Sequence, residues 1–333
     1  MAEAANHTSL ISHVEFTLLG FPGFYAFRRL LFIPFFLIYI ITLSTNGVLI
    51  HIVRTESSLN SPMYILIAAL SAINICGTST VVPKMLLGFL MDFNRISLVG
   101  CLVQMFFIYF IIMMDCNVLL MMALDRYVAI CMPLHYTNIM NRRVMITLVV
   151  AAVFRSVSFV SPVIYLASKV RFCGSDTIRH FACEHMALLS LVCGNISKNK
   201  IVGLSLRVTS MVFDLSFISA SYGSITRAAL KISTGAVRHK SLHTCATHLL
   251  VILVVYFFRL SSSIVYRISR SIPQDTHNLL SSIYLLFPAM VNPLIYGLRT
   301  KEIRTRFLKS LGRPGVAVGR MKPVTVSSGV GGL

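Results

Sequence analysis

Long apolar runs separated by short polar segments make up most of this chain. Seven of them reach the length, about 20 residues, at which a helix crosses the hydrocarbon core of a bilayer. A helix satisfies its own backbone amides and carbonyls, which lipid cannot do, so each run predicts a spanning helix. The predicted spans are residues 30–53, 62–82, 98–124, 144–168, 201–225, 241–266 and 276–298.

The composition agrees with a membrane protein. Of 333 residues, 56% are hydrophobic and 12% are charged, and so few charges could not cover that much apolar surface in water. We therefore expect an all-α membrane protein, a seven-transmembrane helix bundle over residues 30–298 with a long second extracellular loop at 169–200. Residues 1–29 would form an extracellular segment, 299–312 an amphipathic membrane-surface helix, and 313–333 a disordered cytoplasmic tail.

An odd number of spans places the two termini on opposite sides of the membrane. An outside N-terminus puts most loop cations in the cytoplasm, although the 169–200 loop is also basic. The cytoplasmic cations would be Arg142, Arg143, Arg227, Lys231, Arg238, Lys240, Lys301, Arg304, Arg306 and Lys309. The same orientation exposes glycosylation triplets at Asn6 and Asn195. No cleaved signal peptide is apparent, so the first span would direct insertion.

The formal net charge of +19 does not indicate a nucleic-acid partner. The basic residues are scattered through loops between spans and do not gather on one soluble face. Contact with an anionic inner leaflet explains them better, so membrane lipid is an expected partner.

Four of the eight cysteines fall on the outer side, where disulfides persist. These are Cys101, Cys173, Cys183 and Cys193, and three pairings are possible. Cys183 also lies among His180, Glu184 and His185, which could be read as metal ligands. A disulfide would use up Cys183, so we expect neither a metal nor another cofactor.

Several ionisable residues lie inside the predicted spans. Each is a functional candidate, because burying a charge in a membrane is costly. They are Asp115, Arg155, Arg207, Asp214 and Arg259. In the sixth span, Tyr256, Arg259, Ser263 and Arg267 have spacings of three and four, which places them on one helix face.

Five groups of residues, in a specific order, resemble the odorant receptors within the rhodopsin-like G-protein-coupled receptors. They are SPMY at 61–64, MALDRYVAIC followed by PLHY at 122–136, SY at 221–222, KSLHTC with His248, and PAMVNPLIYG at 288–297. The resemblance covers nearly the whole chain, from about Phe16 to Leu311. The long loop, with HFACEHMALLSLVCGN, is similar to that of the class I, or fish-like, odorant receptors.

The resemblance implies an odorant-activated receptor at the plasma membrane that couples to a stimulatory, olfactory-type G protein. It makes Arg126 the pivot of activation, and the residues it implies for the switch are Asp125, Arg126, Tyr127, Tyr222, Asn292, Pro293 and Tyr296. A snorkelling pair that only anchors the helix is the structural alternative. No Asp or Glu occurs between Asp214 and Asp275, so no acid of span six can lock Arg126. We expect a loosely held off state.

The resemblance also implies a polar site within the bundle, formed by Asn46, Asn74, Asp115 and Asn292. Most relatives carry an aspartate at the position of Asn74, so Asp115 is the lone acid of a site that in related receptors holds sodium. Sodium binding is therefore in doubt here. The alternative is a protonated Asp115 hydrogen-bonded to the two asparagines of spans two and seven.

For the outer half, the resemblance implies disulfides Cys101–Cys183 and Cys173–Cys193 and an odorant pocket between spans three, five and six. The expected ligand-binding residues are Tyr109, Arg207, Tyr256, Arg259, Ser263 and Arg267. Class I relatives are associated with short carboxylic acids, and a guanidinium grips a carboxylate with two hydrogen bonds. Alternatively, Asp214 neutralises Arg259 or Arg207. Span six carries Phe258 where relatives often have proline, so a kink from that source is missing.

Two other classes of function would share some of these features. A polytopic transporter of small anions would also bury charges, but transporters commonly show internal repeats and paired broken helices, and the sequence has neither. An intramembrane enzyme would need a nucleophile with its base, or clustered metal ligands. His243 and His248 are five apart, which is off the spacing of one helix face, so we expect no enzyme.

Overall fold

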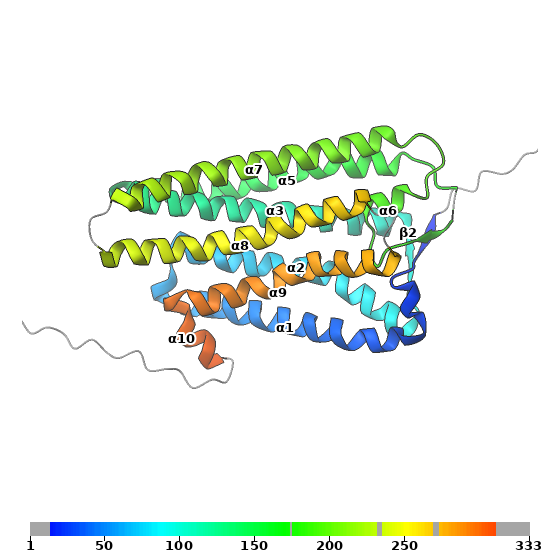
Figure 1. The fold of residues 1–333 in the computed structure, drawn as a ribbon, viewed down its shortest axis with the longest axis horizontal. Helices are drawn as coiled ribbons and strands as arrows, with labels where there is room; N and C mark the ends of the chain where they lie inside the picture. The colour runs from blue at the N-terminus through cyan, green and yellow to red at the C-terminus, as the bar shows by residue number, and fades with distance from the viewer. Residues whose placement is uncertain (1–13, 174, 232–234, 269–272, 311–333) are drawn as a thin grey trace, which may run out of the picture.

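The computed structural model describes residues 14–173, 175–231, 235–268 and 273–310. Within these residues, seven long helices run side by side as one bundle (Figure 1). They are α1 (Arg28–Thr55), α2 (Pro62–Met91), α3 (Leu98–Cys131), α5 (Arg142–Ser168), α7 (Ser197–Lys231), α8 (Gly235–Ile268) and α9 (Gln274–Arg299). Short elements connect them: η1 (Pro22–Phe27), η2 (Ser57–Leu59), η3 (Pro133–His135), α4 (Tyr136–Ile139) and α6 (His185–Leu189).

The predicted seven-helix membrane fold is confirmed. Six of the described helices are long and apolar enough to cross a membrane, and α8 contributes a shorter apolar stretch, Cys245–Ser261. Several helices extend beyond the predicted spans; α2, for example, continues to Met91 and α3 to Cys131. Apolar runs mark only the part of a helix in lipid, while hydrogen bonding continues the helix into the polar interface.

Local sequence explains several helix ends. Ser97 and Asn141 precede α3 and α5, and their side chains accept hydrogen bonds from backbone amides in the first turn. Pro62 stands at the first position of α2, where no amide hydrogen is needed. Asp92 ends α2 in the left-handed region, with φ of 56°. The helix boundaries are therefore encoded by capping residues as well as by hydropathy.

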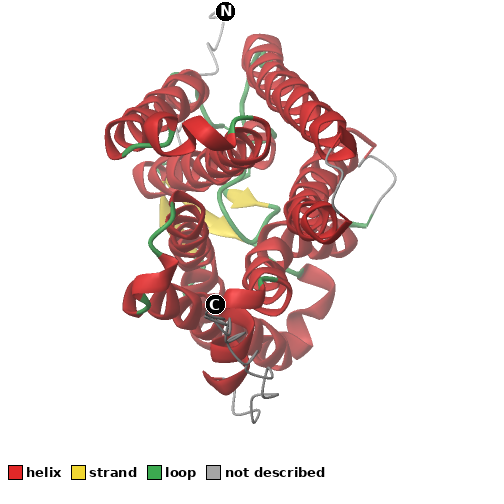
Figure 2. Cartoon of the chain, turned by 90° about the vertical axis from the view of Figure 1, so that its left-hand side faces the viewer, coloured by secondary structure: helices red, strands yellow, loops and turns green. Residues whose placement is uncertain are grey.

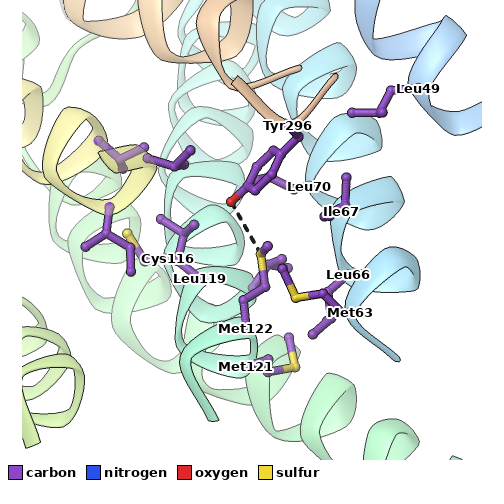
Figure 3. Close-up of a cluster of buried hydrophobic side chains, with 14 of the residues drawn as sticks. Leu49, Met63, Leu66, Ile67, Leu70, Cys116, Leu119, Met121, Met122 and Tyr296 are labelled. Atoms are coloured by element: carbon purple, nitrogen blue, oxygen red, sulfur yellow. Dashed lines mark hydrogen bonds between the residues drawn. The ribbon is translucent and has the colours of Figure 1, made fainter. Parts of the chain in front are cut away.

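The half of the bundle that contains the C-terminal end of α3 holds a large hydrophobic core. Leu49, Leu66, Leu119 and Met122 pack there from α1, α2 and α3, and the Tyr296 ring of α9 lies among them (Figure 3). The Tyr296 hydroxyl donates to the sulfur of Met122 at 3.9 Å. This core connects the helices of the expected switch.

A short helix, α10 (Lys301–Ser310), folds back against the bundle after α9 (Figure 1). Its Phe307 is fully buried against Gly297, where a Cβ atom would lie 2.5 Å from the phenyl ring. Only glycine permits this approach. Arg306 on the same helix forms an ion pair with Glu56 at the end of α1. The packing sets the direction in which α10 leaves the bundle.

The outer end of the bundle carries a small sheet that the all-α expectation did not include. Strand β1 (Glu15–Leu18) pairs antiparallel with β2 (Arg95–Ser97) and parallel with β3 (Thr177–Ile178). Looking along the helices, Figure 2 shows these strands at the far end of the bundle. The segment after β1 is also held by α9, because Asn278 donates to the Gly20 carbonyl and the Gly23 amide donates to Asp275. Strands this short carry no clear periodicity, so only their partners identify them.

Candidate functional site

The main cavity lies in the outer half of the bundle and has a volume of about 100 Å³. Helices α3, α5, α7, α8 and α9 form its walls, and α6 of the long loop contributes His185. Much of the lining is apolar, including Met113, Phe159 and Met211. The polar lining side chains are Tyr109, His185, Arg207, Ser210, Arg259 and Tyr284. A mostly apolar cavity with a few polar groups is typical of a small-molecule site.

The long loop is fastened above this cavity. The structure joins Cys101 of α3 to Cys183 of the loop, with Cα atoms 5.3 Å apart, and Cys173 to Cys193 within the loop, at 5.7 Å. Two tethers in different places hold the loop more tightly than either one alone. Among the described residues, no three His, Cys, Asp or Glu side chains come together as a metal site.

Glu184 and Tyr109 connect the loop to the cavity wall. The Tyr109 hydroxyl donates to Glu184 Oε1 at 3.2 Å and accepts from the His185 amide at 3.2 Å. The other Glu184 oxygen caps α6 by accepting from the Ala187 amide at 2.9 Å. Burial lowers the pKa of His185, so its imidazole is neutral at physiological pH. The sequence prediction included Tyr109, but it considered Glu184 and His185 only as possible metal ligands and missed their bonds to Tyr109.

A buried polar network joins α3, α5 and α7 next to the cavity. Arg155 forms an ion pair with Asp214 at 2.6 Å, and the same nitrogen donates to Ser210 at 3.2 Å. Arg155 also donates to Asn117, whose amide donates to Ser156 at 3.0 Å. The ion pair of Asp214 with Arg155 was not among the sequence predictions, and the alternative that Asp214 also neutralises Arg259 or Arg207 stays a prediction. Which cation faces which acid depends on the rotation of α5, and spacing along the chain does not give it.

Arg259 extends from α8 toward the middle of the bundle. Its guanidinium donates to the sulfur of Cys116 on α3, and it lines both the main cavity and a second, deeper cavity of about 70 Å³. Tyr256, one turn further in, lies in the hydrophobic core and is not among the residues that line the main cavity. Ser263 and Arg267 belong to α8, but their side chains are outside the described residues.

The deeper cavity brings together residues of the expected polar site. Asn74 and Asp115 both line it. The Asn74 amide donates to Asn46 at 3.1 Å, and the Asn46 amide donates to the Ala289 carbonyl at 2.9 Å. Buried Asp115 Oδ1 and the side-chain amide of Asn292 have no hydrogen-bond partner among the described residues. The expected direct bonds from the asparagines to Asp115 are therefore not formed here.

At the C-terminal end of α3, Arg126 pairs with its neighbour Asp125, with the Arg126 Nε 3.0 Å from Asp125 Oδ2. The Tyr136 hydroxyl of α4 donates to the other oxygen, Asp125 Oδ1, at 2.7 Å. Desolvation and the adjacent carboxylate raise the pKa of Tyr136, so the phenol keeps the proton that it donates. Tyr136 was quoted only as part of the PLHY motif, and its role as a partner of Asp125 was missed.

The other expected switch residues lie on α3, α7 and α9. Tyr222 of α7 is partly buried, and its hydroxyl has no hydrogen-bond partner among the described residues. The Tyr296 hydroxyl lies 3.4 Å from His248 Nδ1. Tyr127 is partly buried and Pro293 is buried inside α9. The structure thus holds both tyrosines away from a bond to Arg126, in an arrangement that suits an off state.

Of the two glycosylation triplets, Asn195 lies exposed in the long loop, where its side chain accepts from the Ser197 amide at 2.8 Å. Asn6 lies outside the described residues. An exposed loop asparagine is accessible to the glycosylation machinery in the secretory pathway.

Comparisons with known proteins agree with this geometry. The family model described as "Olfactory receptor" matches residues 35–313. The human olfactory receptors 52D1 and 52K1 are each 39% identical to the chain, over 89% and 90% of its length and 93% and 95% of theirs. The crystal structure of squid rhodopsin superposes with a TM-score of 0.68 and 16% identity, covering 86% of each chain, which establishes the fold alone.

Both the family model and these relatives extend over most of the chain. The family consists of multi-pass membrane receptors that bind small molecules and couple to G proteins, and its members are not enzymes. The class I resemblance fits the olfactory receptor 52 relatives. With a seven-helix bundle, a cavity beneath a disulfide-tethered loop and the Asp125–Arg126 pair in place, the chain belongs to the olfactory receptor family of rhodopsin-like G-protein-coupled receptors.

Proposed function

We propose that this receptor responds to small acids or other electron-rich polar odorants bound in the main cavity. It does so at the plasma membrane with its N-terminus outside, and it activates a stimulatory G protein of the olfactory type. The observation that carries the proposal is the presence of two guanidinium groups, Arg207 and Arg259, in the lining of one largely apolar cavity.

The chemistry of the lining supports an anionic ligand. A guanidinium and a carboxylate form two parallel hydrogen bonds, and in a cavity with little water this contact is strong. A cavity of about 100 Å³ suits an acid with a short apolar chain.

Within this proposal the polar residues have separate roles. Arg207 and the outer cation Arg267 bind the anionic end, with Ser263 between Arg267 and Arg259 on the same helix face. Tyr109 couples ligand binding to the long loop, because its hydroxyl bonds both Glu184 and His185. Tyr256 lies one turn below Arg259 and makes a cation–π contact with it, with the central guanidinium carbon 5.9 Å from the ring centre. A shift of Arg259 on ligand binding would therefore change the contact with Tyr256.

The cytoplasmic end supports a switch of the rhodopsin type. When the inner end of α8 moves outward, Arg126 leaves Asp125 and meets the G protein, with Tyr222 and Tyr296 as new partners. The helix α10 lies on the inner leaflet with its basic residues toward anionic lipid. Cyclic AMP measured in cells that express the receptor tests the G-protein class. A response only through another class contradicts the stimulatory assignment and leaves the switch residues untouched.

The ligand proposal is tested with pairs of short carboxylic acids and their methyl esters. Losing a charge-assisted contact to a desolvated guanidinium costs on the order of 2 to 5 kcal/mol. Arg207→Ala and Arg267→Ala should therefore each weaken the acid response at least ten-fold and barely change the ester response.

The matched controls are Arg207→Lys and Arg267→Lys. They should recover part of the loss, because an ammonium keeps the charge without the two-pronged geometry. Surface expression is measured for each variant. A receptor that prefers the ester, or an acid response unchanged in both alanine variants, contradicts an acidic odorant.

A further inference from the structure

The two cavities of the bundle meet at one side chain, Arg259. The guanidinium lines the odorant cavity on one side and the deeper cavity of about 70 Å³ on the other. Facing it in the deeper cavity are Asp115 and Asn74. Asp115 Oδ1 is fully buried and has no hydrogen-bond partner among the described residues. The deeper cavity therefore holds an acid that needs a positive charge near it.

The residues of this cavity do not fit a sodium ion. A hard cation needs several oxygen ligands, usually with more than one negative charge among them. Among the described residues, Asp115 is the single carboxylate in the lining, and Asn74 supplies a neutral amide whose nitrogen is bonded to Asn46. Arg259 lines the same small space, so a metal ion would also meet a like charge there.

Among the described residues, two cations and two acids interact around this point. Arg155 and Arg259 are the cations, and Asp115 and Asp214 are the acids. Arg155 bonds Asp214, while Arg259 interacts electrostatically with both acids. Removing one member of such a buried set leaves a charge without compensation, which is more costly than removing a whole pair.

We propose that Arg259 is the built-in cation of the deeper cavity: its guanidinium stands opposite Asp115 where a sodium ion would otherwise bind. The bond from Arg259 to Cys116 shows that the side chain already crosses from α8 to α3. Because α8 is the helix that moves on activation, this cross-link holds the off state in the middle of the membrane. The contact takes over the role of the acid that would lock Arg126 in the off state and that the cytoplasmic end of α8 lacks. This role does not depend on the chemistry of the odorant.

The first test uses the unmodified receptor, purified in lipid nanodiscs. Its melting temperature is measured while sodium chloride is replaced by choline chloride at constant ionic strength. We expect no difference between the two salts across the titration. A saturable rise in melting temperature that is specific to sodium overturns the proposal, because it requires a metal ion in the cavity.

The second test is a double-mutant cycle with Asp115→Asn and Arg259→Met. Arg259→Met should lower the melting temperature, because Asp115 loses its counter-ion, and the double variant should melt above that single variant. Arg259→Lys keeps a cation at this position and should lose less than Arg259→Met. Melting losses that simply add in the double variant overturn the pairing.

The signalling readout separates a lock from a merely structural role. Cyclic AMP without odorant, divided by surface expression, should rise in both Asp115→Asn and Arg259→Met by several-fold and rise no further in the double variant. Ligand-free signalling equal to that of the unmodified receptor in both single variants overturns the off-state lock. These measurements need no odorant, so they stand whether or not the acidic odorant is correct.

Discussion

Two ion pairs of this receptor are buried to the same extent and connect the molecule in different ways. In Asp125–Arg126 and in Arg155–Asp214 alike, the aspartate side chain is 0% exposed and the arginine side chain 18% exposed. The first pair joins adjacent residues on α3, and the second joins α5 to α7 across 59 positions of the chain. Burial by itself therefore does not tell what an ion pair does.

The difference lies in what must move when each pair breaks. Asp125 and Arg126 can separate by side-chain rotation, and Tyr136 still satisfies one oxygen of Asp125. Arg155 and Asp214 lie on different helices, and Asn117 and Ser210 also hold the same guanidinium from α3 and α7. A local pair is suited to switching, while a pair between helices is suited to holding the bundle together.

The largest effect is expected from Asp214→Asn. It leaves the Arg155 guanidinium buried without its acid, and breaking such a pair costs on the order of 3 to 5 kcal/mol. The melting temperature of the purified receptor should fall sharply, and surface expression should fall with it. The double variant Arg155→Met with Asp214→Leu should recover most of the loss. A single variant that melts like the unmodified receptor would show that the pair does not cross-link the helices.

Arg126→Ala should affect signalling much more than stability. Odorant-stimulated cyclic AMP should drop to background, while the melting temperature should fall by less than half of the loss seen in Asp214→Asn. The reason is that the ion pair of Arg126 lies within α3 and Asp125 keeps its bond to Tyr136. Both are measured on receptor matched for surface expression. Equal loss of stability in the two variants would erase the distinction between the pairs.

A smaller effect is expected from Tyr136→Phe, which removes the phenol that bonds Asp125. A hydrogen bond to a charged acceptor contributes about 1.5 to 3 kcal/mol, part of which biases the receptor toward the off state. Ligand-free cyclic AMP should rise several-fold without loss of the maximal odorant response. Tyr165→Phe, at the exposed outer end of α5, is the matched control. Unchanged ligand-free signalling would assign Tyr136 to loop folding alone.

The smallest effect is expected from pH at the cytoplasmic face. The pKa of Tyr136 is raised in the folded receptor by desolvation and by Asp125, relative to an ordinary value of about 10. The stabilisation that the Tyr136–Asp125 hydrogen bond gives to the folded receptor is therefore complete below about pH 10. It is lost only as pH rises through the raised pKa of Tyr136. Ligand-free nucleotide exchange in open membranes should stay constant between about pH 7 and 9. A rise over that interval that Tyr136→Phe abolishes would contradict the raised pKa.

The local motifs predicted the cytoplasmic half better than the outer half. Asp125 and Arg126 are neighbours, so their pairing follows from the covalent chain, and the absence of an acid between Asp214 and Asp275 is read directly from the sequence. The hydrogen bond from Tyr136 to Asp125 could also have been predicted, since Tyr136 follows α3 closely in the PLHY motif. In the outer half, Glu184 bonds Tyr109 and His185 lines the cavity because a disulfide holds the long loop over α3.

The number and order of the membrane helices, the starts set by Ser97 and Asn141, and the place of Arg126 at the end of α3 were determined by the sequence itself. These features depend on contacts between residues that are near in the chain. Only the tertiary structure decided that Asp214 faces Arg155, that Arg259 reaches Cys116, and that β1 pairs with two loops. Each of these partners is chosen by how one helix is rotated and set against another, and hydropathy and spacing along a single helix are the same for every such arrangement.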